Sequence, residues 1–111
     1  MTPNKAIEII DRLIPNTYED EDKLRWIDEL DGMVQRLVIQ SDKIKQYSYP
    51  EDMDTELLIP HPFEDAYPLF LEAKIDYYNR EYGNYNNSVL RFETMFDEYK
   101  KAYIREHRAK G

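Results

Sequence analysis

Hydrophobic residues recur with a helical period along residues 66–106. In the second half of this stretch they are spaced by four, three, four, three and four positions, which places them on one stripe of an α-helix. The members of this stripe are Tyr85, Val89, Phe92, Phe96, Tyr99 and Tyr103. The first half carries a matching stripe, made of Tyr67, Leu71, Ile75, Tyr78 and Tyr82. Two such stripes in succession predict an antiparallel helical hairpin.

The turn of this hairpin is predicted at residues 82–87. Gly83 can adopt the left-handed backbone conformation that commonly ends a helix. Asn84 or Asn87 can then cap the second helix, because an asparagine side chain accepts hydrogen bonds from the first free N–H groups.

Prolines predict three further helix boundaries. Proline is favoured at the first helical position and ends a helix elsewhere, because it has no backbone N–H. A helix is therefore predicted to begin at Pro3 and to stop before Pro15, and Pro68 must lie within the first turn of another. The predicted caps are Thr2 and Asp65, with Pro3 and Ala66 as first residues. The first helix has an apolar face of Ala6, Ile9, Ile10, Leu13 and Ile14.

A second helix is predicted from about residue 22 to about residue 40. Its apolar face consists of Leu24, Ile27, Leu30, Val34, Leu37 and Val38. Four consecutive acids at 19–22 favour a helix N-terminus, where they meet the positive end of the dipole, over a cation site. Gly32 weakens a helix interior. We expect it to mark a close approach between helices rather than a hinge.

Residues 41–62 break the helical pattern with prolines and acids, which predicts a long loop. Its apolar exception is Leu57, Leu58 and Ile59, which favour either a short strand or an anchor that pins the loop to the bundle. Long loops are often functional. We therefore expect this one to order on a partner, or else to be a loose connector, and its amides to exchange faster than those of 85–103.

The fold class is thus all-α: one domain over residues 1–111, a small bundle of about four helices built on the hairpin.

Composition narrows the functional classes. The chain has 111 residues, no cysteine and a formal charge of −8. An acidic chain repels phosphate backbones, so direct nucleic-acid readout is not expected. Neither a membrane span nor a secretion signal is present in the pattern, which predicts a soluble intracellular protein. Ten tyrosines carry much of the apolar content, and tyrosine suits half-wet interfaces because its hydroxyl stays hydrogen-bonded.

Catalytic motifs do not emerge from the sequence. His61 lies between two prolines and His107 in the C-terminal tail, and neither has a partner at metal-ligand spacing. Three glycines are too few and too scattered for a phosphate-binding loop. We therefore expect no enzyme activity, no cofactor, no metal and no small-molecule substrate.

Charge is unevenly distributed along the chain. Residues 98–111 contain five Lys or Arg against two acids, a charge of +3 that leaves −11 for residues 1–97. The cations are Lys100, Lys101, Arg105, Arg108 and Lys110. They complement the dipole at a helix C-terminus, or they form a basic tail, about 105–111, that docks on an acidic partner. The candidate partner-interaction residues are Leu57, Leu58, Ile59, Lys100, Lys101, Arg105 and Arg108.

Several stretches resemble a family of small phage and prophage proteins encoded among head and packaging genes. They are Tyr47–Asp52, Asp54–Pro60, Leu71–Tyr77, Asn79–Asn87 and the tyrosine-rich last helix, together about half of the chain. The family is that of the head–tail connector proteins, also called adaptor or head-completion proteins, of long-tailed phages. Its members are small helical bundles that assemble as a ring beneath the portal and join the capsid vertex to the tail.

The resemblance implies a structural virion protein that acts through protein–protein contacts. Its partners would be the portal, the tail-completion proteins and further copies of itself in a ring. It would be found in the bacterial cytoplasm during assembly and at the head–tail junction of the virion. The alternative is a small acidic regulatory or inhibitory binding module, of the scaffold or DNA-mimic type, that acts as a monomer or dimer.

Overall fold

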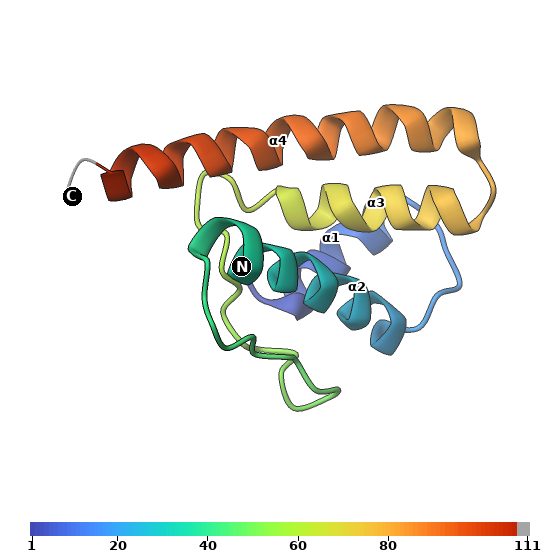
Figure 1. Ribbon diagram of the computed structural model, residues 1–111. Helices are drawn as coiled ribbons and strands as arrows, with labels where there is room; N and C mark the ends of the chain where they lie inside the picture. The colour runs from blue at the N-terminus through green and yellow to red at the C-terminus, as the bar shows by residue number, and fades with distance from the viewer. Residues whose placement is uncertain (109–111) are drawn as a thin grey trace.

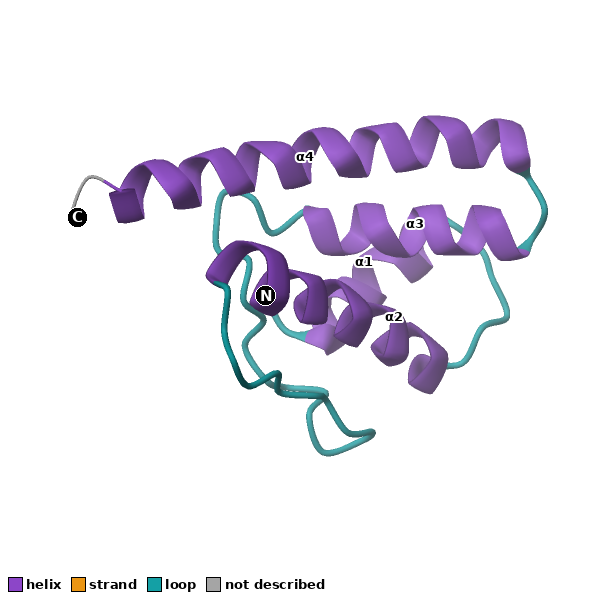
Figure 2. Ribbon diagram, in the orientation of Figure 1, coloured by secondary structure: helices purple, strands orange, loops and turns teal. Residues whose placement is uncertain are grey.

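The computed structural model describes residues 1–108, and within them all regular structure is helical (Figures 1 and 2). The elements are α1 (Pro3–Leu13), α2 (Asp20–Met33), the π-helix η1 (Val34–Ile39), α3 (Ala66–Tyr78) and α4 (Tyr82–Arg108). The antiparallel pair α3 and α4 forms one layer, and α1 and α2 pack against α3 on its other side (Figure 1). The predicted all-α bundle built on a C-terminal hairpin is confirmed.

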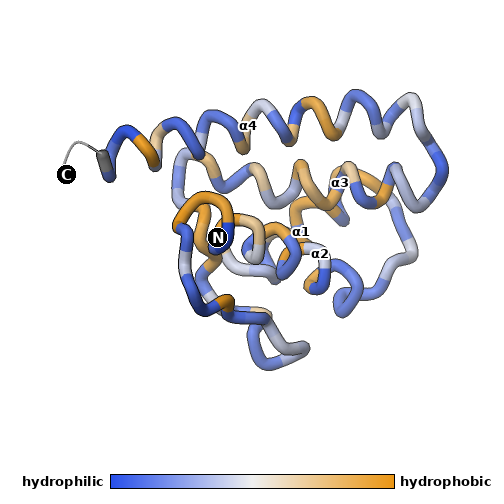
Figure 3. The backbone as a smooth tube through the Cα atoms, viewed as in Figure 1, coloured by the Kyte–Doolittle hydropathy of each residue, from blue (hydrophilic) through white to orange (hydrophobic). Residues whose placement is uncertain are grey.

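The hairpin is held together by the two predicted stripes, but only along part of their length. Tyr67, Leu71 and Ile75 are fully buried in α3. Phe92 of α4 is 7% exposed, and its ring lies 4.9 Å from that of Phe70. Toward the turn the stripes emerge into solvent, where Tyr78 and Tyr82 are 50% and 56% exposed. Hydrophobic stretches of α1, η1 and α3 gather in the middle of the molecule, whereas the outer loop is hydrophilic (Figure 3).

The hairpin turn lies at residues 79–81, earlier than predicted. Arg80 takes the left-handed conformation with φ 61°. Its N–H donates to the carbonyl of Tyr77 at 3.0 Å, and the N–H of Glu81 donates to the carbonyl of Asp76 at 2.9 Å. These two bonds are those of a Schellman motif, which satisfies the last carbonyls of α3. Gly83 has no positive φ and lies inside α4, so its predicted role is wrong. The predicted caps Asn84 and Asn87 also lie inside α4.

The helix starts set by proline are confirmed. Pro3 begins α1, and Thr2 caps it by accepting a hydrogen bond from the N–H of Lys5 at 3.2 Å. Ala66 begins α3 after the cap residue Asp65, although the Asp65 side chain makes no capping hydrogen bond. A proline in the first turn loses no helical hydrogen bond, which is why these boundaries can be predicted locally.

The second helix begins at Asp20, two residues before its predicted start, and changes to a π-helix at Val34. A π turn takes up more residues than an α turn, so the apolar face shifts around the axis. Leu37, predicted in the core, is therefore 61% exposed. A Cβ added to Gly32 would meet nothing within 4 Å, so the expected close approach of helices there is wrong.

Residues 41–62 have no helix or strand, as predicted, but they are not a loose connector. Leu57 and Ile59 are 5% and 0% exposed and belong to the hydrophobic core. The N–H of Leu57 donates to the carbonyl of Met1 at 2.9 Å, and Met53 accepts from the N–H of Asn4 at 3.0 Å. The loop is thus anchored to the start of α1. Uniformly fast amide exchange, expected for a loose segment, does not fit these bonds.

Replacing Gly32 by alanine is expected to stabilise the protein by about 0.4–1 kcal/mol. Alanine loses less backbone entropy than glycine on folding, and its methyl group has free space at this position. Urea denaturation followed by circular dichroism measures the change. A lower denaturation midpoint for Gly32→Ala would contradict this assignment and support a close approach of another helix at Gly32.

Replacing Phe92 by alanine is expected to destabilise the protein by about 3–5 kcal/mol, because a buried ring is lost and a cavity remains. Leu90 provides a matched control on the same helix, since it is 61% exposed. For Leu90→Ala the free energy of unfolding should change by no more than about 0.5 kcal/mol. Equal effects of the two substitutions in the same denaturation experiment would contradict the assigned hairpin packing.

Candidate interaction surface

The C-terminal half of α4 projects beyond its hairpin partner. α4 has 27 residues and α3 has 13, which correspond to lengths of about 40 Å and 20 Å. The second half of α4 therefore has no helix of the hairpin beside it. It instead passes over η1 and the end of the long loop before reaching the C-terminus (Figure 1).

Two adjoining grooves lie under this half of α4. One, of about 280 Å³, is formed between η1 and α4 by Leu37, Val38, Lys100, Tyr103 and Ile104, among others. The second, of about 280 Å³, lies between α4 and the loop and is lined in part by Ile39, Leu58, Phe63, Tyr103 and His107. Tyr103 and His107 belong to both grooves.

Exposed apolar side chains gather around these grooves. Leu37, Ile39, Leu58 and Ile104 are 61%, 38%, 36% and 43% exposed. These four come from three separate segments, so only the fold brings them together. We define the C-terminal surface as Leu37, Ile39, Leu58, Tyr103, Ile104 and His107. An exposed apolar patch assembled in this way is typical of a protein-interaction site.

Stacked rings fix the shape of the C-terminal surface. The imidazole of His107 lies face to face with the ring of Tyr103, at 3.8 Å and 16°. Nδ1 of His107 is 2.8 Å from the carbonyl oxygen of Tyr103. Tyr103 in turn contacts Tyr99, which is buried, and burial raises the pKa of Tyr99 to about 12. The rings therefore continue the hairpin core out to the grooves.

Basic side chains border the C-terminal surface. Lys100 lines the groove beside η1, where its ammonium lies 5.6 Å from the centre of the Phe96 ring and 3.6 Å from the carboxylate of Asp97. Lys101 and Arg105 are exposed and lie one turn apart. Their helical positions place them on the side of α4 opposite Tyr99. The surface thus combines an apolar floor with a basic outer row.

The structure divides the residues that the sequence singled out. Leu57 and Ile59 are buried core residues, so they are not available to a partner, which corrects that part of the expectation. Leu58 is exposed and lies in the same groove as Tyr103. Lys100 lies at the adjoining groove, and Lys101 and Arg105 face solvent. Arg108 is the last residue of α4, but its side chain is not described. Lys110 lies outside the described residues. Binding by the exposed members stays a prediction.

Five residues of the C-terminal surface were not identified from the sequence as interaction residues: Leu37, Ile39, Tyr103, Ile104 and His107. An uninterrupted α-helix would place Leu37 on the buried face, and only the π-helix turns it outward. Ile104 carried a usable signal, because it is apolar yet lies off the aromatic stripe of its helix.

Among residues 1–108, no group of three His, Cys, Asp or Glu side chains is placed to hold a metal ion. In the same part of the chain, none of the helices combines the length and apolar character that crossing a membrane requires. Comparisons of the chain with protein-family models, with curated proteins and with solved structures gave no match.

Proposed function

We propose that this protein is a head–tail connector subunit of a long-tailed phage or prophage, which acts through protein–protein contacts. It would assemble as a ring, and its C-terminal surface would dock on the portal or on a tail-completion protein. The assembly would form in the bacterial cytoplasm and remain at the head–tail junction of the virion. Catalysis and cofactors play no part in this proposal.

The C-terminal surface is the observation that carries the proposal. It presents apolar side chains of η1, the loop and α4 beside the part of α4 that projects beyond the hairpin, where a partner can reach them. Tyrosine and arginine, here Tyr103 and Arg105, are residue types enriched at protein interfaces. The π-helix that exposes Leu37 adds support, because π-helical turns are frequently found at functional sites.

The sequence resemblance supplies the specific identity of the assembly. The resembling stretches include Asp54–Pro60, which carries Leu58 of the C-terminal surface. They also include the tyrosine-rich helix α4 itself. A small helical bundle is the architecture that this resemblance implies, and the described fold is of that class.

A second candidate function is a small acidic regulatory or inhibitory module. The charge of −11 over residues 1–97 favours it, because an acidic surface can imitate nucleic acid. The two candidates differ in assembly: a connector forms rings or binds a portal, whereas an inhibitor acts on one target as a monomer or dimer. Mass measurement of the protein mixed with its portal distinguishes them.

Replacing Leu37 by glutamate is expected to abolish capture of the protein by portal in a pull-down, because it places a charge in the apolar groove. Stability should change by no more than about 0.5 kcal/mol, since Leu37 is 61% exposed. Leu90→Glu is the matched control, with the same exposure but a position remote from the C-terminal surface. Capture of both variants at full strength would exclude this surface as the portal-binding site.

Neutralising Lys101 and Arg105 as glutamines separates the two roles considered for the basic residues. If they only complement the helix dipole, each substitution lowers the free energy of unfolding by about 0.3–1 kcal/mol at low salt, and portal capture is unchanged. If they dock on an acidic partner, as we propose, the fold keeps its stability. Capture then weakens to the level that the wild type shows at high ionic strength. These substitutions keep the stacked pair of Tyr103 and His107, which deletion of residues 105–111 would disrupt.

Full-strength joining of heads to tails by a chain that ends at Ile104 would also contradict docking through the basic tail. The measurement is a complementation assay with the truncated protein. Circular dichroism of the same protein checks that the helical fold is retained.

A further inference from the structure

Polar side chains along one face of α2 and η1 hold the long loop. Asp28, Asp31 and Gln35 are spaced by three and four positions, which places them on the same side of the helix. Asp28 accepts a hydrogen bond from the N–H of Tyr47 at 2.8 Å. The Gln35 side chain accepts from the N–H of Lys45 at 2.8 Å and donates to the carbonyl of the same residue at 3.0 Å. The first limb of the loop is thus bound through its backbone.

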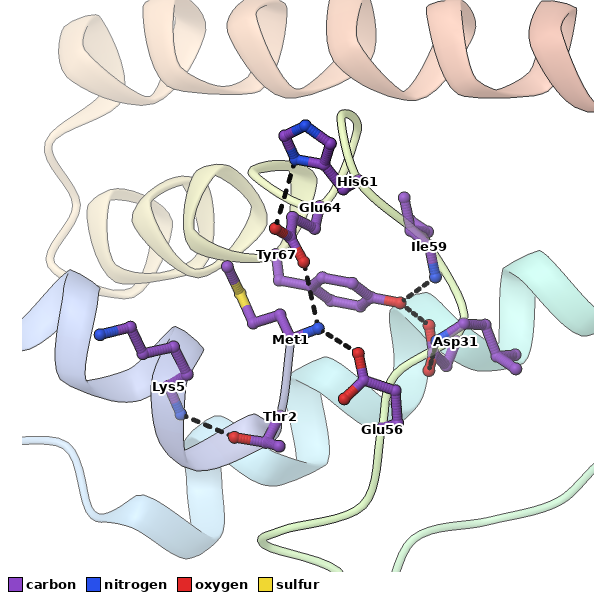
Figure 4. Close-up of polar contacts among 10 residues, drawn as sticks. Met1, Thr2, Lys5, Asp31, Glu56, Ile59, His61, Glu64 and Tyr67 are labelled. Atoms are coloured by element: carbon purple, nitrogen blue, oxygen red, sulfur yellow. Dashed lines mark hydrogen bonds and ion pairs between the residues drawn. The ribbon is translucent and has the colours of Figure 1, made fainter.

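Asp31 lies at the centre of this network and is fully buried. Its carboxylate accepts hydrogen bonds from the hydroxyl of Tyr47 at 2.6 Å and from the N–H of Leu58 at 3.2 Å. The hydroxyl of Tyr67 in α3 also donates to it, and accepts in turn from the N–H of Ile59 at 2.7 Å. Figure 4 shows the Tyr67 hydroxyl pointing at Asp31 and Ile59. One carboxylate therefore joins α2, both limbs of the loop and α3.

These hydrogen-bonding partners bring no positive charge to Asp31. The titratable groups that face it are Asp28 on its own helix, Tyr47 of the loop, Tyr67 of α3 and Tyr99 of α4. Burial raises the pKa of Asp31, and the nearby Asp28 raises it further, whereas the hydrogen bonds from both tyrosines and from Leu58 lower it without cancelling the effect. The closed loop therefore binds a proton at Asp31 more tightly than an open loop would.

The network also determines the position and orientation of the Leu58 side chain. Asp31 holds the N–H of Leu58, and Tyr67 holds the N–H of the next residue. With both amides fixed, the side chain of Leu58 is directed outward, where it is 36% exposed and lines the groove under α4.

We propose that Asp31 is a latch that closes residues 41–62 onto α2 and positions Leu58 in the C-terminal surface, and that protonation of its carboxylate tightens the closed state. Asp31 is a positioning residue in this scheme, because it touches no partner itself. The link to binding rests on the proposed function of the surface, whereas the latch can be tested on the isolated protein.

The direction of the pH effect follows from linkage. Opening exposes Asp31 to water and returns its pKa to the ordinary carboxyl value. As the pH rises from that value through the raised pKa of the closed state, the closed state loses its advantage and the loop opens more often. Above the raised pKa the opening equilibrium becomes constant. Each unit of difference between the two pKa values changes the opening constant about tenfold.

The test is amide hydrogen exchange by NMR on the whole chain, corrected for the intrinsic pH dependence of exchange. In the wild type, protection of the Leu58 and Ile59 amides should fall as pH rises above the ordinary carboxyl range. In Asp31→Asn, which keeps the shape but cannot ionise, their protection should not vary with pH. Amides of Phe92 and Phe96 in α4 are the internal control and should not follow the change.

Identical pH dependence in the wild type and in Asp31→Asn would overturn the latch. So would loss of protection at Leu58 in step with the α4 amides, because the whole fold would then be opening.

Tyr47→Phe provides a second variant should Asp31→Asn fail to fold. It removes a single donor to the carboxylate, and that donor lowers the pKa of Asp31, so the pKa of the closed state should rise further. The fall in protection should therefore extend to higher pH. The closed state should also open more often at neutral pH, because the ionised carboxylate has one donor fewer. No change in either respect would equally overturn the proposal. Since these measurements need no partner, their outcome is independent of whether the portal binds.

Discussion

The buried carboxyl group of Asp31 lies where α2, the long loop and α3 meet. Removing an ionised carboxylate from water is costly unless hydrogen-bond donors surround it. For Asp31 those donors come from both limbs of the long loop and from Tyr67 of α3. The hydrogen-bonding capacity of this buried carboxyl group is therefore satisfied only when α2, the loop and α3 have come together. This requirement explains why a stretch rich in acids and prolines packs closely instead of hanging free.

The same loop completes a support for α4. The hairpin alone can cover only about half of this helix, because α3 is so much shorter. Beyond that point α4 rests on η1 and on the loop, which together bury Tyr99. The π-helix contributes by turning Leu37 away from the core and toward the groove. A local change of helical pitch and a loop held by a buried acid thus act on the same surface.

Charge and apolar exposure are arranged in a way that suits an assembling protein. The acidic residues lie mainly before residue 98 and the basic row lies on the projecting half of α4. Long-range attraction between such a row and an acidic partner speeds and orients encounter, whereas the apolar floor supplies the lasting contact. The connector proposal uses both features, and each is presented by side chains exposed to solvent.

Features that depend on neighbours along the chain could be predicted from the residues alone. Spacing in the stripes predicted the hairpin and the burial of Phe92 and Phe96, of which Phe92 is buried and Phe96 is only partly buried. Prolines predicted the starts of α1 and α3. These are local effects, because helical periodicity and the missing N–H of proline act within one or two turns.

Other features depend on contacts between segments that are far apart in the chain. The turn could not be placed from its glycine, because α3 ends at a Schellman motif in which Arg80, rather than Gly83, takes the left-handed conformation. Leu37 lies outside the core because the helix changes to a π-helix, and the spacing of the residues does not predict that change. The role of Asp31 was equally hidden. An acid within a helix is ordinarily solvated, and its burial depends on tyrosines that lie 16 and 36 positions away in the chain.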